Sequence, residues 1–177
     1  SGSGSGISLS RLAQKGAIVT GLDCSIMALQ FFEYLAHHYM VPDKVNLVHG
    51  DYFNTEFDDG VFDIVYNAGV FEHLNDQQPN ELLKEMIRIT KRGGYVVIAI
   101  PNEDSLFYKR FKQKELTIRK NFPGLVGIPV EHSRYHLDLR KIMEGASLRI
   151  IKEDGLLVAP SSPIEIGDIL RTDLEIF

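Results

Sequence analysis

Residues 62–74 read FDIVYNAGVFEHL, and the fold assignment starts from this segment. Phe62 to Tyr66 form a short run of strand-forming residues that follows the turn signal at 58–60 and stops at Asn67. Similar strands are predicted at 17–22, 45–48 and 95–100, separated by helical patterns at 7–14, from 26 to at least 35, and at 79–89. This alternation predicts parallel βαβ units, and therefore an α/β fold with a doubly wound, mostly parallel sheet covered by helices on both faces.

Local signals mark the ends of these elements. Ser25 is the predicted N-cap of the second helix, and the sequence KRGG at 91–94 closes the third. Beyond the fourth strand we expect a helix at 138–143, a strand at 148–151 and a helical pattern at 164–170. Residues 103–135 interrupt the rhythm with a basic stretch and an irregular end, so we expect a lid or substrate insertion there. Residues 1–177 are otherwise expected to form a single domain.

Composition narrows the class of protein. Hydrophobic residues make up 44% and charged residues 24% of the 177 residues, as in a folded globular domain. No apolar run is long enough to span a bilayer, and the start does not resemble a signal peptide. The single cysteine favours a reducing, cytoplasmic location. The net charge of −5 argues against broad electrostatic binding to nucleic acid.

Small polar or acidic residues follow the predicted strands. In an open parallel sheet, ligands bind at the carboxyl ends of the strands. Asp23, Asp51 and Asn67 lie at such ends, and a glycine-rich turn, GSGSG at 2–6, precedes the first helix. An acidic side chain after the second strand of such a fold can accept both ribose hydroxyls, and glycines allow the close approach of a ligand. The pattern therefore predicts a nucleoside site at this edge.

These motifs together resemble those of the class I, Rossmann-like, S-adenosylmethionine-dependent methyltransferases over residues 1–160. Residues 2–6 resemble the family's glycine motif, GLD at 21–23 its ribose-binding acid, and GDYF at 50–53 its adenine motif. Residues 62–74 are similar to the fourth-strand motif, and KRGGY at 91–95 to the turn before the fifth strand. Each motif alone is weak evidence, but five in the family's order and spacing are strong evidence.

The resemblance implies an enzyme that transfers the methyl group of S-adenosylmethionine to an oxygen, nitrogen or carbon atom of an acceptor. We expect a small-molecule acceptor, although the aromatic and basic insertion also suits a protein or RNA. The implied general base is His73. The implied cofactor contacts are Gly2, Gly4, Gly6, Asp23, Cys24, Asp51, Tyr52, Asn67 and Ala68. The implied substrate contacts are Phe71, His132, Arg134 and Tyr135.

The sequence also departs from the family's pattern. The family's first strand and the acid before the glycines would lie upstream of Ser1, and no seventh strand is evident after Pro160. We therefore expect that the chain is a fragment and that its sheet lacks the family's first strand. If no strand forms after Pro160, the sheet lacks the family's last strand as well.

Alternative interpretations stay open for individual residues. Residues 1–6 have the composition of a cloning linker, Asp23 also fits a turn, and His73 fits a packed histidine at a helix start as well as a base. Glu131, His132 and His136 have metal-ligand side chains without the supporting spacing, so no metal is expected.

Two other functions compete with methyl transfer. A dinucleotide-binding oxidoreductase requires G-x-G-x-x-G, but here the third glycine comes one residue early. A non-catalytic protein that binds S-adenosylmethionine would share every cofactor motif and differ only in lacking turnover.

Overall fold

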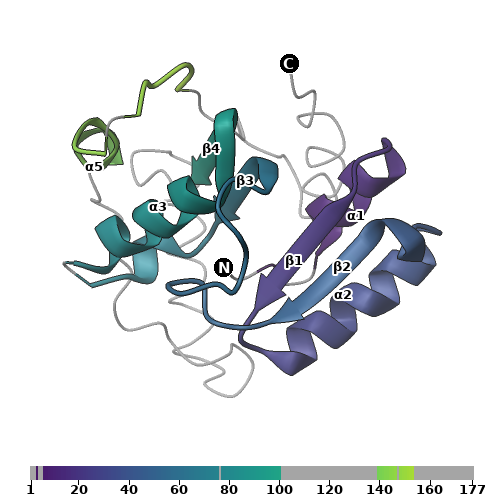
Figure 1. Cartoon of the computed structure of the whole chain (residues 1–177). Coiled ribbons are helices and arrows are strands. Elements are labelled where there is room, and N and C mark those ends of the chain that lie inside the picture. The colour runs from purple at the N-terminus through teal and green to yellow at the C-terminus, as the bar shows by residue number, and fades with distance from the viewer. Residues whose placement is uncertain (1–2, 4–5, 76, 101–138, 147, 154–177) are drawn as a thin grey trace, which may run out of the picture.

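The computed structural model describes residues 3, 6–75, 77–100, 139–146 and 148–153. Within this part, the strands form two parallel pairs, each packed against its own helices (Figure 1). No helix in these ranges is long and apolar enough to cross a membrane. The predicted insertion at 103–135 and the pattern at 164–170 lie outside the described residues.

The first pair consists of β1 (Val19–Asp23) and β2 (Val45–His49), in a register that places Asp23 opposite His49. Helices α1 (Ile7–Gln14) and α2 (Ile26–His38) pack against these strands, and the short η1 (Pro42–Lys44) leads into β2. The Ser25 side chain accepts a hydrogen bond from the Ala28 N–H at 3.3 Å, so the predicted N-cap is confirmed. The core of this unit is formed by Ala13, Val19, Phe32 and Val41.

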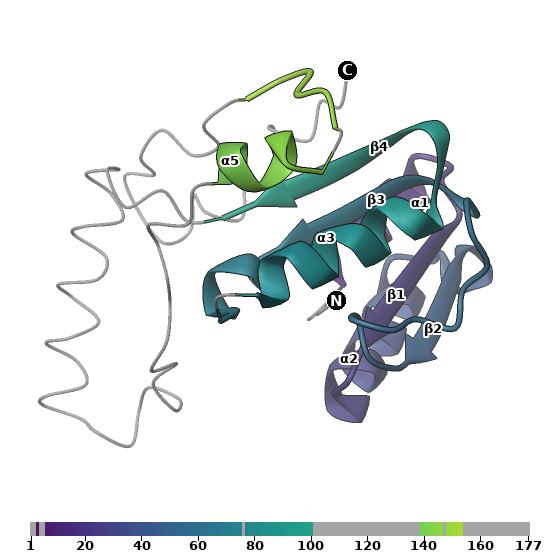
Figure 2. The same cartoon turned by 60° about the vertical axis from the view of Figure 1, so that its left-hand side comes forward.

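The second pair consists of β3 (Phe62–Ala68) and β4 (Thr90–Ala99), with Ala68 opposite Ala99. Helix α3 (Gln78–Ile89) packs on this pair, and α5 (Leu139–Glu144) packs beside α3 (Figure 2). Between β3 and α3 lies η2 (Phe71–His73). Helix α3 is strongly amphipathic, and its apolar side forms a core with two residues that follow β3. The helix contributes Leu82, Leu83 and Met86, and the segment after β3 contributes Phe71 and Leu74.

The predicted KRGG turn is an irregularity inside β4. The strand register passes from Phe62 opposite Thr90 directly to Ile64 opposite Tyr95, so residues 91–94 bulge out opposite Asp63. Gly93 adopts a φ of 81°, which favours glycine. The sequence therefore located the backbone irregularity correctly, while the strand begins earlier than expected, at Thr90.

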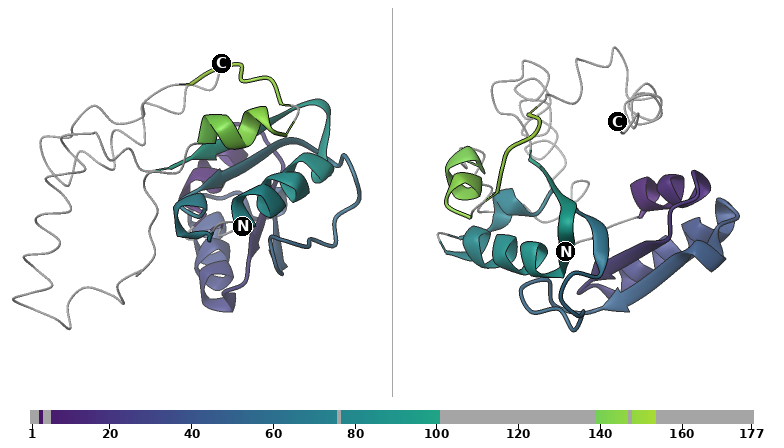
Figure 3. Two further views of the ribbon diagram at one scale, coloured as in Figure 1. Left: turned by 90° about the vertical axis from the view of Figure 1, so that its left-hand side faces the viewer. Right: turned by 45° about the horizontal axis from the view of Figure 1, so that its top comes forward.

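One continuous sheet was predicted, but the described strands form two separate pairs. Neither β1 nor β2 is hydrogen-bonded to β3 or β4 within the described ranges. Within each pair the two arrowheads point the same way, so the carboxyl ends of its two strands lie side by side (Figures 2 and 3). The predicted ligand edge is therefore present in each pair.

The predicted strand at 148–151 is wrong. Residues 148–153 form no regular element, because no neighbouring strand within the described part pairs with them. Ile151 is 66% exposed, and Arg140 of α5 forms an ion pair with Glu153. Helix α5 covers Leu139–Glu144, close to its predicted range of 138–143, of which residue 138 is not described.

The ring of Phe32 joins the parts of the first unit. It has no exposed surface and lies against the backbone of Gly6 and Gly21, where an added Cβ on either glycine would overlap the ring. Gly6 also has a φ of 68°, which a side chain rarely adopts. The glycine-rich turn, β1 and α2 are thus in contact through one aromatic side chain.

We predict that Gly6→Ala strongly destabilises the protein. The added methyl group would force the Phe32 ring to move in addition to straining the backbone, with an expected loss of about 3 kcal/mol in the free energy of unfolding. Gly16→Ala is the matched control, because Gly16 has a φ of 107° but no atom within 4 Å of an added Cβ. It should lose only about 1–2 kcal/mol, the cost of a left-handed backbone conformation for a residue with a Cβ. Urea denaturation measures both, and equal losses would contradict the packing role of Phe32.

Candidate active site

The end of β1 is built around a buried acid. Asp23 is 6% exposed, and its Oδ1 accepts a hydrogen bond from the Ser25 N–H at 2.9 Å. The Asp23 carbonyl accepts from the Gly50 N–H at 3.2 Å, and His49 Nε2 lies 3.0 Å from the Cys24 carbonyl oxygen. These bonds hold the segment after β1 against the segment after β2. The predicted residues Asp23 and Cys24 therefore lie on a fixed edge, with the Cys24 side chain exposed.

The glycine-rich turn is hydrogen-bonded to the same strand, β1. The Ser3 N–H donates to the Leu22 carbonyl of β1 at 3.0 Å, and the Gly6 N–H donates to the Ser3 carbonyl at 2.9 Å. The Ser3 hydroxyl is buried and makes no hydrogen bond within the part of the chain that the structure describes. Gly2 and Gly4 lie outside the described residues, but Ser3 and Gly6 bring the turn against β1. These contacts support the binding-turn interpretation over a linker.

The segment after β2 places an aromatic pair beside these acids. Asp51 Oδ1 accepts from the Phe53 N–H at 2.9 Å and so closes a tight turn around Tyr52. The rings of Tyr52 and Phe53 pack with centroids 4.6 Å apart. Burial raises the pKa of the Tyr52 hydroxyl, and negative charge on Cys24, Asp51 and Asp23 raises it further. The structure thus brings together four of the predicted cofactor contacts.

A charged anchor ties the rest of this loop to α3. The Thr55 N–H and hydroxyl both donate to Glu85 Oε1, at 2.8 and 2.6 Å. Arg88 donates from Nε to Glu85 Oε2 at 2.8 Å and from Nη1 to the Phe57 carbonyl, also at 2.8 Å. Arg88 and Thr55 hold the pKa of Glu85 at about 2, well below its ordinary 4.5. The sequence pattern did not reveal this anchor, because its partners lie about thirty positions apart.

The end of β3 supplies a second set of polar groups. Asn67 is 2% exposed, Ala68 ends the strand, and the Gly69 N–H donates to the Ala99 carbonyl at 3.3 Å. His73 follows in η2, where its side chain is about one-third exposed and therefore accessible. The predicted base is thus partly exposed in η2, shortly after the end of β3, and its role as a base stays a prediction.

Phe71 corrects one of the predicted substrate contacts. Its side chain has no exposed surface and packs in the core with Leu74, Leu82, Leu83 and Met86. A ligand arriving from solvent cannot reach it in this arrangement, so Phe71 has a packing role. His132, Arg134 and Tyr135, the other predicted substrate contacts, lie outside the described residues.

Glu72 is a candidate that sequence reasoning overlooked. It is 3% exposed, its Oε1 lies 3.9 Å from His73 Nε2, and its Oε2 is buried without a hydrogen-bond partner. A buried carboxylate is costly unless it is paired or binds a cation. The available signal was a charged residue between the apolar residues Phe71 and Leu74.

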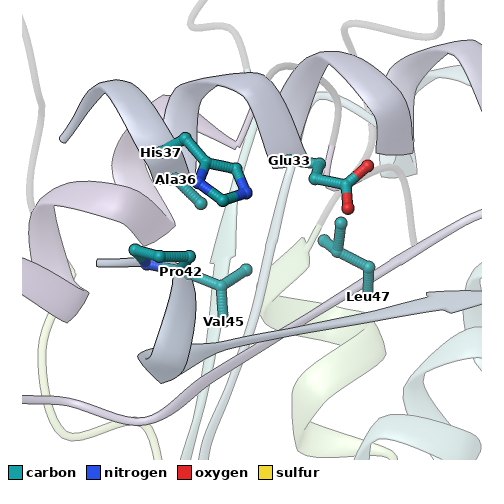
Figure 4. A pocket seen from close by; sticks show the side chains of 6 residues that line it. All are labelled: Glu33, Ala36, His37, Pro42, Val45 and Leu47. Atoms are coloured by element: carbon teal, nitrogen blue, oxygen red, sulfur yellow. The ribbon is translucent and has the colours of Figure 1, made fainter. Parts of the chain in front are cut away.

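A pocket elsewhere in the first unit is separate from this edge. It has a volume of about 210 Å³ and is lined by residues of α2, η1 and β2, with His37 and Glu33 projecting toward it from α2 (Figure 4). Val45, at the start of β2, contributes to its wall, so the pocket lies away from the carboxyl end of that strand. It is also smaller than typical ligand pockets. No cluster of three or more metal-ligating side chains occurs among the described residues.

Comparison with known proteins places this site in a family. Residues 1–98, which include the glycine-rich turn, β1, β2, β3 and all of β4 but its last residue, match the family described as the methyltransferase domain. The chain belongs to this methyltransferase family. The family predicted from the sequence is thereby confirmed.

Two curated methyltransferases resemble the chain at low sequence identity. The chain is 30% identical to a probable tocopherol O-methyltransferase of Oryza sativa subsp. japonica over 85% of this chain and 41% of that protein. It is 28% identical to the ajmaline N-methyltransferase of Rauvolfia serpentina over 56% of this chain and 35% of that protein. The chain therefore spans about two fifths of the length of these curated relatives, or less.

The fold class is confirmed by solved structures. A SAM-dependent methyltransferase from Aquifex aeolicus superimposes with a TM-score of 0.61 at 18% sequence identity, covering 85% of this chain and 71% of that chain. At this identity the likeness concerns the fold. The two strand pairs of the methyltransferase chain therefore correspond to parts of a Rossmann-like methyltransferase fold.

We predict that the Glu85 anchor weakens in acid. The depressed pKa means that its contribution to stability is fully present above pH 4.5 and is lost as the pH falls through 2. Urea unfolding of the protein and of Glu85→Gln, compared at pH 6 and pH 3, should show the stability difference between them shrinking at pH 3. A pH-independent difference would contradict the ion-pair assignment. Comparison with the variant is necessary because other carboxylates also titrate in this range.

Proposed function

We propose that the protein transfers the methyl group of S-adenosylmethionine to a small-molecule acceptor. The observation that carries the proposal is the buried Asp23 at the end of β1, with Tyr52 and the glycine-rich turn beside it. Family membership supports the cofactor, and the acceptors named for the rice and Rauvolfia relatives are small molecules. Because these relatives are named for O- and N-methylation, the attacking atom in this protein is left open.

The described residues fit the cofactor chemically. A carboxylate has about four acceptor positions, so the Asp23 side chain can shape its own loop through Ser25 and is also of the chemical type that accepts hydrogen bonds from ribose hydroxyls. Asp51 is proposed to accept from the adenine amino group, with the exposed Cys24 and the Tyr52 ring against the base. The amino-acid end would lie toward the glycine turn (Gly2, Gly4, Gly6), Asn67 and Ala68. A ligand ammonium group there is a suitable partner for the buried Glu72 Oε2.

The protein's part in the reaction is positioning. The bound cofactor supplies a methyl group already activated on a sulfonium, so no metal or nucleophilic side chain is required. The chain has to hold the acceptor in line with that methyl, a contribution that can reach about 7–11 kcal/mol of barrier lowering. His73, exposed at the end of β3, is proposed to remove the proton of an oxygen or nitrogen nucleophile.

The competing functions make different predictions. An oxidoreductase would bind NADH, for which the glycine spacing at 2–6 is unfavourable. A non-catalytic relative would bind S-adenosylhomocysteine but transfer no methyl group to any small molecule. The cytoplasmic location and the choice between small-molecule and macromolecular acceptors stay predictions.

We expect Asp23→Ala to weaken S-adenosylhomocysteine binding about 10- to 100-fold, the equivalent of one charge-assisted hydrogen bond of about 1.5–3 kcal/mol. Isothermal titration calorimetry measures this, with NADH as the alternative ligand. Asp43→Ala is the matched control, since Asp43 is an exposed acid in η1, before β2 begins. Glu72→Gln in the same titration tests the ammonium contact. Unchanged affinity in Asp23→Ala, or binding of NADH instead, would overturn the assignment.

We expect His73→Gln to lower kcat about 10²- to 10⁴-fold with an oxygen or nitrogen acceptor while leaving S-adenosylhomocysteine affinity unchanged. The acceptor can be found by incubating the protein and a labelled methyl donor with a metabolite extract, and identifying the labelled product by mass. Turnover equal to that of the unmodified protein would remove His73 from the mechanism.

A further inference from the structure

The wall of the proposed adenine site is an irregular loop. Residues 50–61, between β2 and β3, form no helix or strand. Such a segment has to be ordered by specific contacts, because fixing each residue costs about 1–2 kcal/mol of conformational entropy. Tyr52 and Phe53 sit at its beginning, where the turn closed by Asp51 sets their local conformation. That turn alone does not determine where the loop lies relative to the second unit.

Hydrogen bonds from helix α3 fix the position of the loop. Glu85 accepts both the N–H and the hydroxyl of Thr55, two residues after Phe53. Arg88 donates from Nη2 to the Thr55 carbonyl at 3.2 Å and from Nη1 to Asp59 Oδ1 at 2.6 Å. The Gly60 N–H donates to the Arg88 carbonyl at 2.9 Å. The loop from Thr55 to Gly60 is therefore bound to the last two turns of one helix.

The anchor itself is rigid. Arg88 is held by Glu85 through two parallel hydrogen bonds, Nε to Oε2 and Nη2 to Oε1, at 2.8 and 2.7 Å. This bidentate geometry fixes the guanidinium plane, and the Glu85 side chain is only 11% exposed. Between these residues in the sequence, Met86 is buried in the core that also contacts Tyr52 and Phe53. Both polar and apolar contacts therefore hold the loop in a defined position relative to α3.

We propose that Glu85 and Arg88 are positioning residues for nucleoside binding, which hold Tyr52 and Phe53 in the binding conformation through Thr55. This inference rests on the proposed function of the same site. Among the described residues, the two side chains form hydrogen bonds to each other and to residues 55, 57 and 59, so we infer that their effect on the ligand is indirect. If the loop adopts the competent conformation in only a tenth of the molecules, the apparent Kd rises tenfold.

The test compares S-adenosylhomocysteine affinity with local order in the loop. Arg88→Ala should raise Kd about tenfold, and Arg88→Lys by a smaller factor, since a lysine cannot reproduce the planar set of donors. Lys91→Ala is the matched control, because it removes an exposed ion pair in the same region whose partner, Asp63, lies on β3 and not in the loop. Hydrogen exchange should show lost protection at the Phe53 and Thr55 amides while the amides of α3 remain protected.

The outcomes are separable. Arg88→Lys is the fallback if Arg88→Ala fails to fold. A folded Arg88 variant whose Kd lies within twofold of the unmodified protein would overturn the positioning role and leave the proposed function standing. Equal weakening by Lys91→Ala, or loss of protection throughout α3, would show a general stability effect and would also overturn it. Absence of S-adenosylhomocysteine binding in the unmodified protein would overturn the proposed function itself.

Discussion

The contact between the Phe32 ring and the backbones of Gly6 and Gly21 is the constraint on which the first unit depends. A buried aromatic ring can lie directly on two backbone segments only where both lack a Cβ. Through this contact α2 sets the distance between the glycine-rich turn and β1, and Asp23 lies two residues beyond Gly21 on the same strand. The glycines therefore serve core packing, and the close approach that they allow also places the turn beside the strand end where the ligand is proposed to bind.

The chain forms the same kind of tight turn after β1 and after β2. Asp23 and Asp51 each accept a hydrogen bond from the backbone N–H two residues later, which turns the chain sharply after the strand. Each acid thus shapes its own loop and is also proposed to bind the nucleoside. The second unit contributes differently, through a helix whose charged residues hold the loop from a distance. The proposed nucleoside site consequently draws on both strand pairs, although the described strands of the two pairs are not hydrogen-bonded to each other.

Sequence patterns predicted the local elements well because their causes are local. The Ser25 cap, the helix at Ile7–Gln14 and the KRGG irregularity are each determined by a few neighbouring residues. Contacts between distant residues were not predictable in this way: the anchoring of the loop by Glu85 and Arg88 and the division of the strands into two pairs both depend on residues far apart in the sequence. The strand expected at 148–151 failed for the same reason, since apolar alternation cannot supply a partner strand.

A crystal structure of the protein with bound S-adenosylhomocysteine tests the central claim most directly. The account predicts the ribose hydroxyls within hydrogen-bonding distance of the Asp23 carboxylate, the adenine against Tyr52 and the amino-acid end toward the glycine-rich turn. A nucleoside bound elsewhere, for example in the pocket between α2 and β2, with the Asp23 edge empty, would contradict it.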